Sequence, residues 1–272
     1  MTANENKPGK VITVCSAKGG IGRTVLTVNV AVALSKKNMQ ISILDGYQQF
    51  GDVGLAMDLQ SRFTMKDVID NFDGMDADSF SGHLSTHESG VKVLPAPDKP
   101  EYAELVTDSV VGDVLDWLKE NNDYVLVDTA AGLQEGNLFL LEKSDLVLVV
   151  TDLVMPALKN TKLMLETLNA LGMKDKVRVV VNRSTMESVI HASDVSGILG
   201  VENLFYIPND FKTVSQSLNI GVPFVMSKGK TELAKAVFKM AEQLTSGERA
   251  PEAPSKNKSL FPKLFSKKEK NR

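Results

Sequence analysis

The eight residues AKGGIGRT at positions 17–24 combine three glycines with a lysine, an arginine and a threonine hydroxyl. An apolar run, VITVCS at 11–16, precedes them, and a helical pattern follows at once. A glycine-rich turn between a strand and a helix presents backbone N–H groups at the helix N-terminus, where an anion is stabilised. This order of elements therefore predicts a phosphate-binding loop.

The loop departs from the strict GxxxxGK[ST] pattern at two positions. Ala17 replaces the first glycine, and Arg23 replaces the lysine that binds phosphate, while Thr24 keeps the hydroxyl that such loops place on Mg²⁺. Arginine keeps the positive charge, but its planar guanidinium is not interchangeable with a compact ammonium in a tight loop. We expect phosphate binding to survive and the geometry for phosphoryl transfer to change.

Short apolar runs alternate with helix-length segments along the chain. The runs are apolar on both faces, which is typical of parallel strands covered by helices on both sides. We therefore predict an α/β fold, a single-domain doubly wound and mostly parallel sheet flanked by helices. The predicted strands are 11–16, 41–45, 91–96, 124–128, 146–151, 177–182 and 204–208, and the predicted helices are 24–37, 109–121, 157–171, 211–219 and 231–244.

The composition excludes several classes of protein. Hydrophobic residues are 43% and charged residues 24% of the 272, which disfavours a wholly disordered or fibrous chain. No apolar run approaches the ~18 residues of a spanning helix, and the N-terminus lacks a signal-peptide hydrophobic stretch, so a cytosolic protein is expected. The single cysteine, Cys15, excludes an internal disulfide and a multi-thiolate metal site.

Four regions are expected along the chain: a disordered N-terminus at 1–9, the folded domain at 10–244, a mobile linker at 245–258 and a basic tail at 259–272. The linker is rich in Pro, Ser, Ala and charged residues. The tail, SLFPKLFSKKEKNR, places its four large apolar side chains on one side of a helical wheel and lysines mostly opposite. It is predicted to be a short amphipathic segment.

Several segments resemble the MinD and ParA family of dimeric nucleotide-switch ATPases. The loop is similar to the family's deviant Walker A motif, xKGGxGKT, and YVLVDTAAGL to its Walker B region. ISILDGYQQFGDVGLAMDL looks like its switch segment, and VVNR and IPND look like its nucleotide-base loops. The resemblance covers residues 10–244 and is strongest to the CpaE and TadZ branch, the localisation ATPases of tight-adherence pili. It implies a P-loop NTPase fold and a homodimer that binds ATP and Mg²⁺.

The resemblance also implies roles for individual residues. Lys18 matches the signature lysine that reaches the partner's phosphates, and with Asp45 it makes up the implied catalytic pair. Thr24 and Asp128 match the residues that hold Mg²⁺, and Asn182 matches the asparagine that contacts adenine. The full set of implied nucleotide-binding residues is Ala17, Lys18, Gly19, Gly20, Ile21, Gly22, Arg23, Thr24, Val25, Asn182, Arg183, Pro208, Asn209 and Asp210.

The switch segment departs from the family pattern DxD. Asp45 is present, but Tyr47 replaces the second acid, which positions the attacking water in the family. Phosphoryl transfer is catalysed mainly by positioning and charge stabilisation, so the changes at Arg23 and Tyr47 together predict slow or absent hydrolysis. Asp52, in the nearby FGD string, is a candidate to replace the missing carboxylate.

The tail resembles the membrane-targeting tail of MinD. Residues 256–272 carry seven cationic side chains and one acidic side chain, a net charge of +6, which leaves −9 for residues 1–255. One such tail binds an anionic membrane weakly, whereas an ATP-linked dimer presents two and gains avidity. We therefore expect peripheral attachment to the inner face of the cytoplasmic membrane. A solvated basic tail that aids solubility is the alternative.

Two other functions are excluded by the residues present, and two stay open as alternatives to the nucleotide switch. Iron–sulfur relatives need paired cysteines, and bacterial tyrosine kinases need a tyrosine cluster in the tail, whereas the last tyrosine here is Tyr206. A DNA-partitioning role stays open, although the acidic body argues against nucleic acid as a partner. A scaffold with nucleotide as a structural ligand also stays open, and the protein partner is unknown. The lysines weighed for a DNA-binding surface are Lys212, Lys228, Lys230, Lys235 and Lys239.

Overall fold

A central sheet of eight strands runs through the part of the chain that the computed structural model describes, residues 8–246. The strands are β1 (Lys10–Cys15), β2 (Ile41–Asp45), β3 (Ser85–Thr86), β4 (Lys92–Leu94), β5 (Tyr124–Asp128), β6 (Leu146–Thr151), β7 (Val177–Val181) and β8 (Phe205–Tyr206). Their order in the sheet is β3-β4-β2-β5-β1-β6-β7-β8, and every neighbouring pair is parallel except β3 with β4. The predicted fold class is confirmed.

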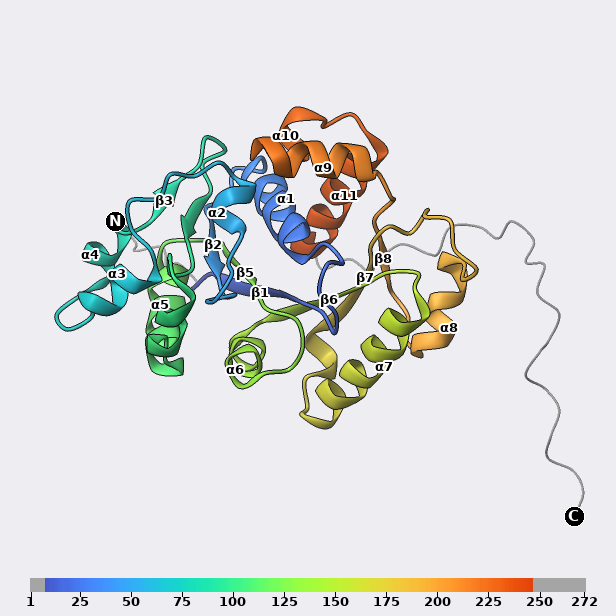
Figure 1. The fold of residues 1–272 in the computed structure, drawn as a ribbon, viewed down its shortest axis with the longest axis horizontal. Helices are drawn as coiled ribbons and strands as arrows, with labels where there is room; N and C mark the ends of the chain where they lie inside the picture. The colour runs from blue at the N-terminus through green and yellow to red at the C-terminus, as the bar shows by residue number, and fades with distance from the viewer. Residues whose placement is uncertain (1–7, 247–272) are drawn as a thin grey trace, which may run out of the picture.

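Helices cover both faces of the sheet (Figure 1). On one face lie α1 (Arg23–Ser35), α2 (Val53–Ala56), α9 (Phe211–Ile220), α10 (Phe224–Ser227) and α11 (Glu232–Ser246). The other face carries α3 (Met65–Asp70), α4 (Ala77–Ser81), α5 (Asp108–Glu120), α6 (Glu135–Lys143), α7 (Met155–Ala170) and α8 (Val195–Leu199). Three 3₁₀ turns complete the described elements, η1 (Pro100–Leu105), η2 (Lys174–Lys176) and η3 (Ala192–Asp194).

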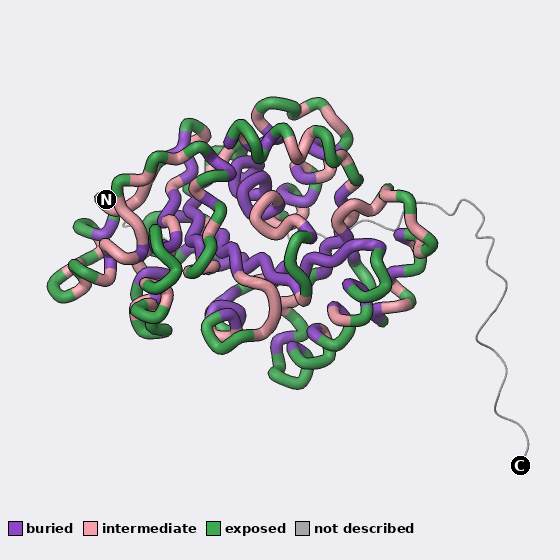
Figure 2. The backbone as a smooth tube through the Cα atoms, viewed as in Figure 1, coloured by how far each residue is buried: buried purple, intermediate pink, exposed green. Residues whose placement is uncertain are grey.

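The strands are buried on both sides, as their continuous apolar runs require (Figure 2). In β1, Ile12 and Val14 belong to the core beneath α1 and α11, while Val11 and Cys15 belong to cores on the opposite face. Asn29 ties two helices together inside the first core, because its Oδ1 accepts the Val225 N–H at 3.1 Å. The central strands are therefore packed between helices on both faces of the sheet.

The structure differs from the sequence prediction mainly between residues 46 and 90. This region contains the short helices α2, α3 and α4 and the antiparallel strand β3, none of which was predicted. The three helices are four to six residues long, and β3 has two residues. Such short elements are set by local contacts, as when Thr64 forms a capping box with Asp67 at the start of α3. Longer periodic segments carry the sequence signal, so α6, α8 and α10 were missed for the same reason.

The structure describes the chain as far as Ser246. Helix α11 continues to Ser246, two residues beyond the predicted boundary at residue 244. Most of the predicted linker and all of the predicted tail, residues 259–272, lie outside the described residues. Within residues 8–246, no helix combines the length and apolar character needed to cross a bilayer.

Candidate functional site

The phosphate loop joins the central strand β1 to α1 at the carboxyl edge of the sheet (Figure 1). Gly20 and Gly22 have φ of 73° and 94°, a region that L-residues with side chains rarely adopt. A Cβ at Gly22 would also lie 2.5 Å from Asn182 Nδ2. No atom lies within 4 Å of the position that a Cβ would take at Gly19 or Gly20. These two glycines therefore leave open space above the loop, on the side where a ligand would sit.

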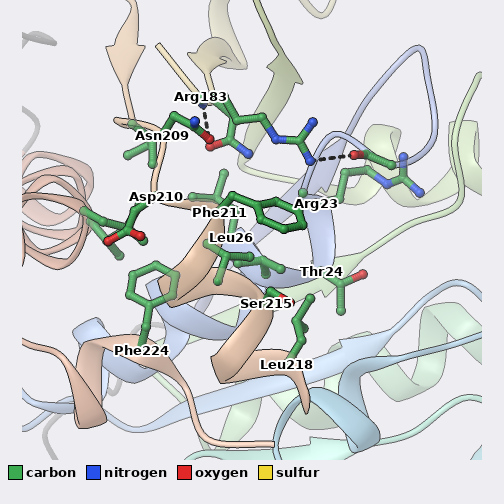
Figure 3. A pocket seen from close by; sticks show the side chains of 18 of the residues that line it. Arg23, Thr24, Leu26, Arg183, Asn209, Asp210, Phe211, Ser215, Leu218 and Phe224 are labelled. Atoms are coloured by element: carbon green, nitrogen blue, oxygen red, sulfur yellow. Dashed lines mark hydrogen bonds between the residues drawn. The ribbon is translucent and has the colours of Figure 1, made fainter. Parts of the chain in front are cut away.

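A cavity of about 570 Å³ opens beside the loop, a size typical of small-molecule sites (Figure 3). Its wall combines the loop with the ends of β7 and β8 and with α9. The predicted residues that line it are Gly19, Gly20, Gly22, Arg23, Thr24, Val25, Asn182, Arg183, Pro208, Asn209 and Asp210. The structure thus brings together the three predicted segments, although the first lies more than 150 residues before the other two in the sequence.

Three of the predicted loop residues do not line this cavity. Ile21 is buried in the core, Ala17 packs against the core on the opposite face, and Lys18 is exposed at the outer rim. Asp45 and Asp128 are also buried, outside the lining. Within residues 8–246, the Lys18 ammonium makes no hydrogen bond or ion pair, so its charge is available to a partner outside the chain.

Arg23, which stands at the usual lysine position, is bonded to the protein itself. Its Nε donates to Thr129 O at 2.9 Å, and its Nη1 donates to Lys18 O at 3.0 Å and to Ser16 Oγ. These bonds clamp the loop to the end of β5. These bonds use only the N–H groups of Nε and Nη1. The N–H groups of Nη2 therefore stay available to an anion in the cavity.

Thr24 and Asp128 meet at the phosphate end of the site. Thr24 Oγ1 donates to Asp128 Oδ2 at 2.5 Å, and Thr27 Oγ1 donates to Asp128 Oδ1 at 3.3 Å. Burial raises the pKa of Asp128 to about 6, against the opposing effects of the Thr24 hydrogen bond and the Arg23 charge. A hydroxyl and a carboxylate in contact are oxygen ligands of the kind that Mg²⁺ prefers.

A second buried carboxylate, Asp45, lies beside Asp128. The two residues are register partners in the β2–β5 pair. The backbone N–H groups of Tyr47 and Val53 donate to Asp45 at 3.2 and 3.1 Å. Burial first, and then the neighbouring Asp128, raise the pKa of Asp45 to about 8. Two carboxyls buried together disfavour their charged forms, and a divalent cation would relieve this cost, so the donor set fits Mg²⁺.

These shifts predict how stability depends on pH in the nucleotide-free protein. Both folded pKa values lie above the ordinary value of 3.8, so the folded state holds these protons more tightly than the unfolded state. Their stabilising effect is full below that value and is lost as the pH rises through about 6 and about 8. We expect the thermal midpoint to fall between about pH 5 and about pH 9, with a weaker fall in Asp45→Asn. Equal slopes in the two proteins would contradict this assignment.

Asn182 and Arg183 tie the loop after β7 to the phosphate loop. Asn182 Nδ2 donates to Ile21 O at 2.8 Å, and its Oδ1 accepts the Arg183 N–H at 2.9 Å. Arg183 Nη2 donates to Gly20 O at 3.0 Å across the mouth of the cavity (Figure 3), and Nη1 lies 3.9 Å from Asp152 Oδ2. The predicted base-contacting asparagine therefore also holds the loop in place, which the sequence did not indicate.

The loop after β8 enters α9 through a cap. Asp210 Oδ1 accepts the Thr213 N–H at 3.0 Å. Hydrogen bonding to the Thr213 side chain first, and then to its backbone N–H, lowers the pKa of Asp210. Phe211, the first residue of α9, is 73% exposed and lines the cavity, as do Val214 and Leu218 one and two turns later. Sequence reasoning missed this apolar wall, although the i, i+3, i+7 spacing of the three residues was a signal for it.

The switch segment brings two more residues to the cavity, Tyr47 and Asp52. The Tyr47 ring lies edge-on to Phe50, with centroids 6.1 Å apart. Gly51 lies directly before Asp52 in the sequence. A Cβ at Gly51 would lie 2.3 Å from Asp45 Oδ2 and 2.6 Å from Ala96 Cβ. The segment therefore packs directly on the buried carboxylate.

Gly51→Ala is expected to lower the free energy of unfolding by about 2 kcal/mol or more, because neither Asp45 nor Ala96 can move away easily. Gly54→Ala is the matched control, since no atom lies within 4 Å of its Cβ position. That change is expected to be neutral or stabilising by up to about 1 kcal/mol. Urea denaturation compares the two, and equal stabilities would refute the close packing of residue 51 on Asp45.

A doubly wound sheet whose central strand runs into a glycine-rich loop and a helix, with a hydroxyl and a carboxylate at the phosphate end, defines a P-loop nucleotide-binding protein. A family model described as an AAA domain matches residues 9–181. The chain belongs to this family, and within it to the ATPases of the MinD/ParA type.

Individual relatives agree with this assignment. The chain is 27% identical over 259 residues to the septum site-determining protein MinD of Thermotoga maritima, covering 89% of this chain and 90% of that protein. The ParA family ATPase from Chlorobium tepidum has a TM-score of 0.80 at 22% identity, over 86% of this chain and 98% of the other. MinD of Pyrococcus horikoshii, solved with Mg-ADP, has a TM-score of 0.76 at 23% identity, over 87% and 96%. The two structures show the shared fold.

Proposed function

We propose that this protein is an ATP-dependent dimeric switch that positions a machine of the cell envelope and hydrolyses ATP slowly. The observation that supports the proposal is the altered phosphate end of the cavity beside the glycine-rich loop. Arg23 is bonded inward to Thr129 and Lys18, and Tyr47 occupies the place where the family has a second acid. The loop, Thr24 and Asp128, which nucleotide binding requires, are present. The two positions that would place the phosphates and the attacking water for transfer, Arg23 and Tyr47, are changed.

The chain's own residues account for nucleotide binding. No side chain caps the start of α1, and the space above Gly19 and Gly20 is open, so phosphates would accept hydrogen bonds from the helix's first backbone N–H groups. Thr24 and Asp128 would hold Mg²⁺, which neutralises phosphate charge when it is bound. The relative solved with Mg-ADP supports this cofactor pair.

The exposed position of Lys18 supports dimerisation. Its ammonium is exposed and unpaired within residues 8–246, at the rim of the nucleotide site. A partner subunit's phosphates would accept this charge, which links nucleotide occupancy to assembly. Because the Lys18 ammonium of one subunit would contact nucleotide bound to the other, the dimer would be stabilised only when nucleotide is bound.

The machine that is positioned is argued from sequence similarity. MinD relatives are described as septum site-determining proteins, which favours a machine at the division site or elsewhere on the envelope. The FGD string and the IPND segment before α9 favour the CpaE and TadZ branch, and hence a pilus machine. The protein partner would bind the nucleotide-dependent dimer.

Membrane attachment is assigned to residues 259–272. These residues lie outside the described part of the chain, and the proposal depends on their amphipathic, basic pattern. Deletion of residues 259–272 is expected to abolish ATP-dependent co-sedimentation with anionic liposomes. Unchanged binding by the truncated protein would remove the tail from the proposal.

Multi-angle light scattering with ATP, with ADP and without nucleotide tests the switch. We expect a dimer with ATP and Mg²⁺, a monomer in the other two states, and slow phosphate release under the same conditions. A dimer fraction that does not respond to nucleotide would favour the scaffold instead. Phosphate release as fast as that of MinD/ParA-type ATPases generally would refute the slow-hydrolysis part.

A further inference from the structure

The loop after β2 packs on Asp45 and fixes its own last residue, Asp52, which is the N-cap of α2. On one side of Asp52, the Val53 N–H donates to Asp45 Oδ2 at 3.1 Å. On the other side, Gly51 packs so closely on Asp45 that even a Cβ would not fit. Because both neighbours are held against a buried group of β2, the position of Asp52 is set by the sheet and not by a free loop.

Asp52 lines the nucleotide cavity, and its carboxylate has no partner within residues 8–246. Asp52 lines the same cavity as Arg23, Thr24 and Tyr47 and is exposed to solvent. It stands at the N-cap of α2, where an aspartate ordinarily accepts a backbone N–H, yet its side chain makes no capping hydrogen bond. Within residues 8–246, no hydrogen bond or ion pair of this carboxylate is formed.

The other polar groups nearby are committed or point elsewhere. Asp210 is the second acidic residue in the cavity wall, and it caps α9 through the Thr213 N–H. Gln48 donates through Nε2 to Asp45 O at 2.9 Å and, like Gln49, lines a separate hollow near α6. Asp52 is therefore the free carboxylate of the cavity wall in the described structure.

We propose that Asp52 orients the water that attacks ATP, in place of the acid that is missing at Tyr47. The carboxylate accepts a hydrogen bond from the water, whose oxygen forms a bond to the γ-phosphorus as the bond to the β–γ bridging oxygen breaks. ADP leaves with that oxygen, and the proton of the water passes through the carboxylate to solvent. Asp52 is exposed to solvent, and it acts without the second acid that the family has. Both features would make turnover slow, because the reaction depends on holding the attacking water in a fixed position.

This inference rests on the proposed function and is tested with Asp52→Asn in the full chain. We expect ATP turnover to fall about tenfold or more, ATP affinity to stay within about twofold, and the ATP-loaded dimer to live correspondingly longer. Asp58→Asn is the matched control, since Asp58 is an exposed acid just beyond α2 that does not line the cavity. That control is expected to match the unmodified protein in all three measurements.

The double variant Asp52→Asn with Tyr47→Asp separates a positioning role from a structural one. If Asp52 orients water, the carboxylate at residue 47 takes over that role, and the double variant turns over ATP as fast as Tyr47→Asp alone. A double variant slower than Tyr47→Asp by the same factor as Asp52→Asn is slower than the unmodified protein, turnover of Asp52→Asn within about twofold of the unmodified protein, or no turnover by the unmodified protein would each overturn the inference. If ATP neither binds nor drives dimerisation, the proposed function itself fails, which is a separate result.

Discussion

Replacing Tyr47 by aspartate is expected to raise steady-state ATP turnover by about tenfold or more, and adding Arg23→Lys is expected to raise it further. Tyr47 lines the same cavity as Thr24, so a carboxylate at this residue would lie in the site where water attacks. The lysine would remove a guanidinium that is bonded to Thr129 O and Lys18 O and would provide a compact ammonium for the phosphates.

A phosphate-release assay with saturating ATP and Mg²⁺ measures this effect. Tyr47→Asn is the control, because it has the size of aspartate without its charge, and it is expected to leave turnover near the original value. A rise of equal size in Tyr47→Asn would mean that the bulk of the ring limits turnover. No rise in Tyr47→Asp would remove the missing acid as the cause of slow hydrolysis.

Replacing Lys18 by alanine is expected to abolish the ATP-dependent dimer while the fold keeps its stability. The Lys18 side chain is exposed, and its ammonium has no partner within residues 8–246, so its loss removes no internal contact. In a dimer it would face phosphates, where charge-assisted hydrogen bonds are strong, and an affinity loss of about 30-fold or more is expected. ATP binding to the monomer should change much less, because the loop's N–H groups remain.

Light scattering with ATP and Mg²⁺ reads out this prediction, and a urea titration checks stability. Lys174→Ala is the control, since Lys174 is exposed in η2, away from the nucleotide cavity. Both variants should unfold at the same urea concentration. A Lys18→Ala protein that still dimerises with ATP would show that this lysine does not cross the interface.

The strands that carry the site followed directly from the sequence. β2, β5 and β6 have the predicted bounds, because buried parallel strands are continuous apolar runs bounded by polar residues. The phosphate loop was predicted with equal ease, since its glycines serve backbone geometry that few other residues allow. Local patterns of this kind need no knowledge of distant contacts.

The remaining parts of the site depend on contacts between distant segments. Arg23 bonds to Thr129, and Asn182 bonds to Ile21, across 106 and 161 positions of sequence. The segment around Gly51 folds onto Asp45 through steric fit and two backbone hydrogen bonds, for which no periodicity exists to be read. The sequence could therefore name Asp52 as a candidate, but only the fold shows that it lines the cavity and that its carboxylate makes no capping hydrogen bond.

Titration calorimetry with ATP in the presence and absence of Mg²⁺ tests the central claim, that the loop between β1 and α1 holds a triphosphate. We predict saturable binding of one nucleotide per chain, which weakens strongly without Mg²⁺ and in Thr24→Ala because Thr24 and Asp128 lose the ion between them. No binding heat at any ATP concentration, or equal affinity with and without Mg²⁺, would contradict the account.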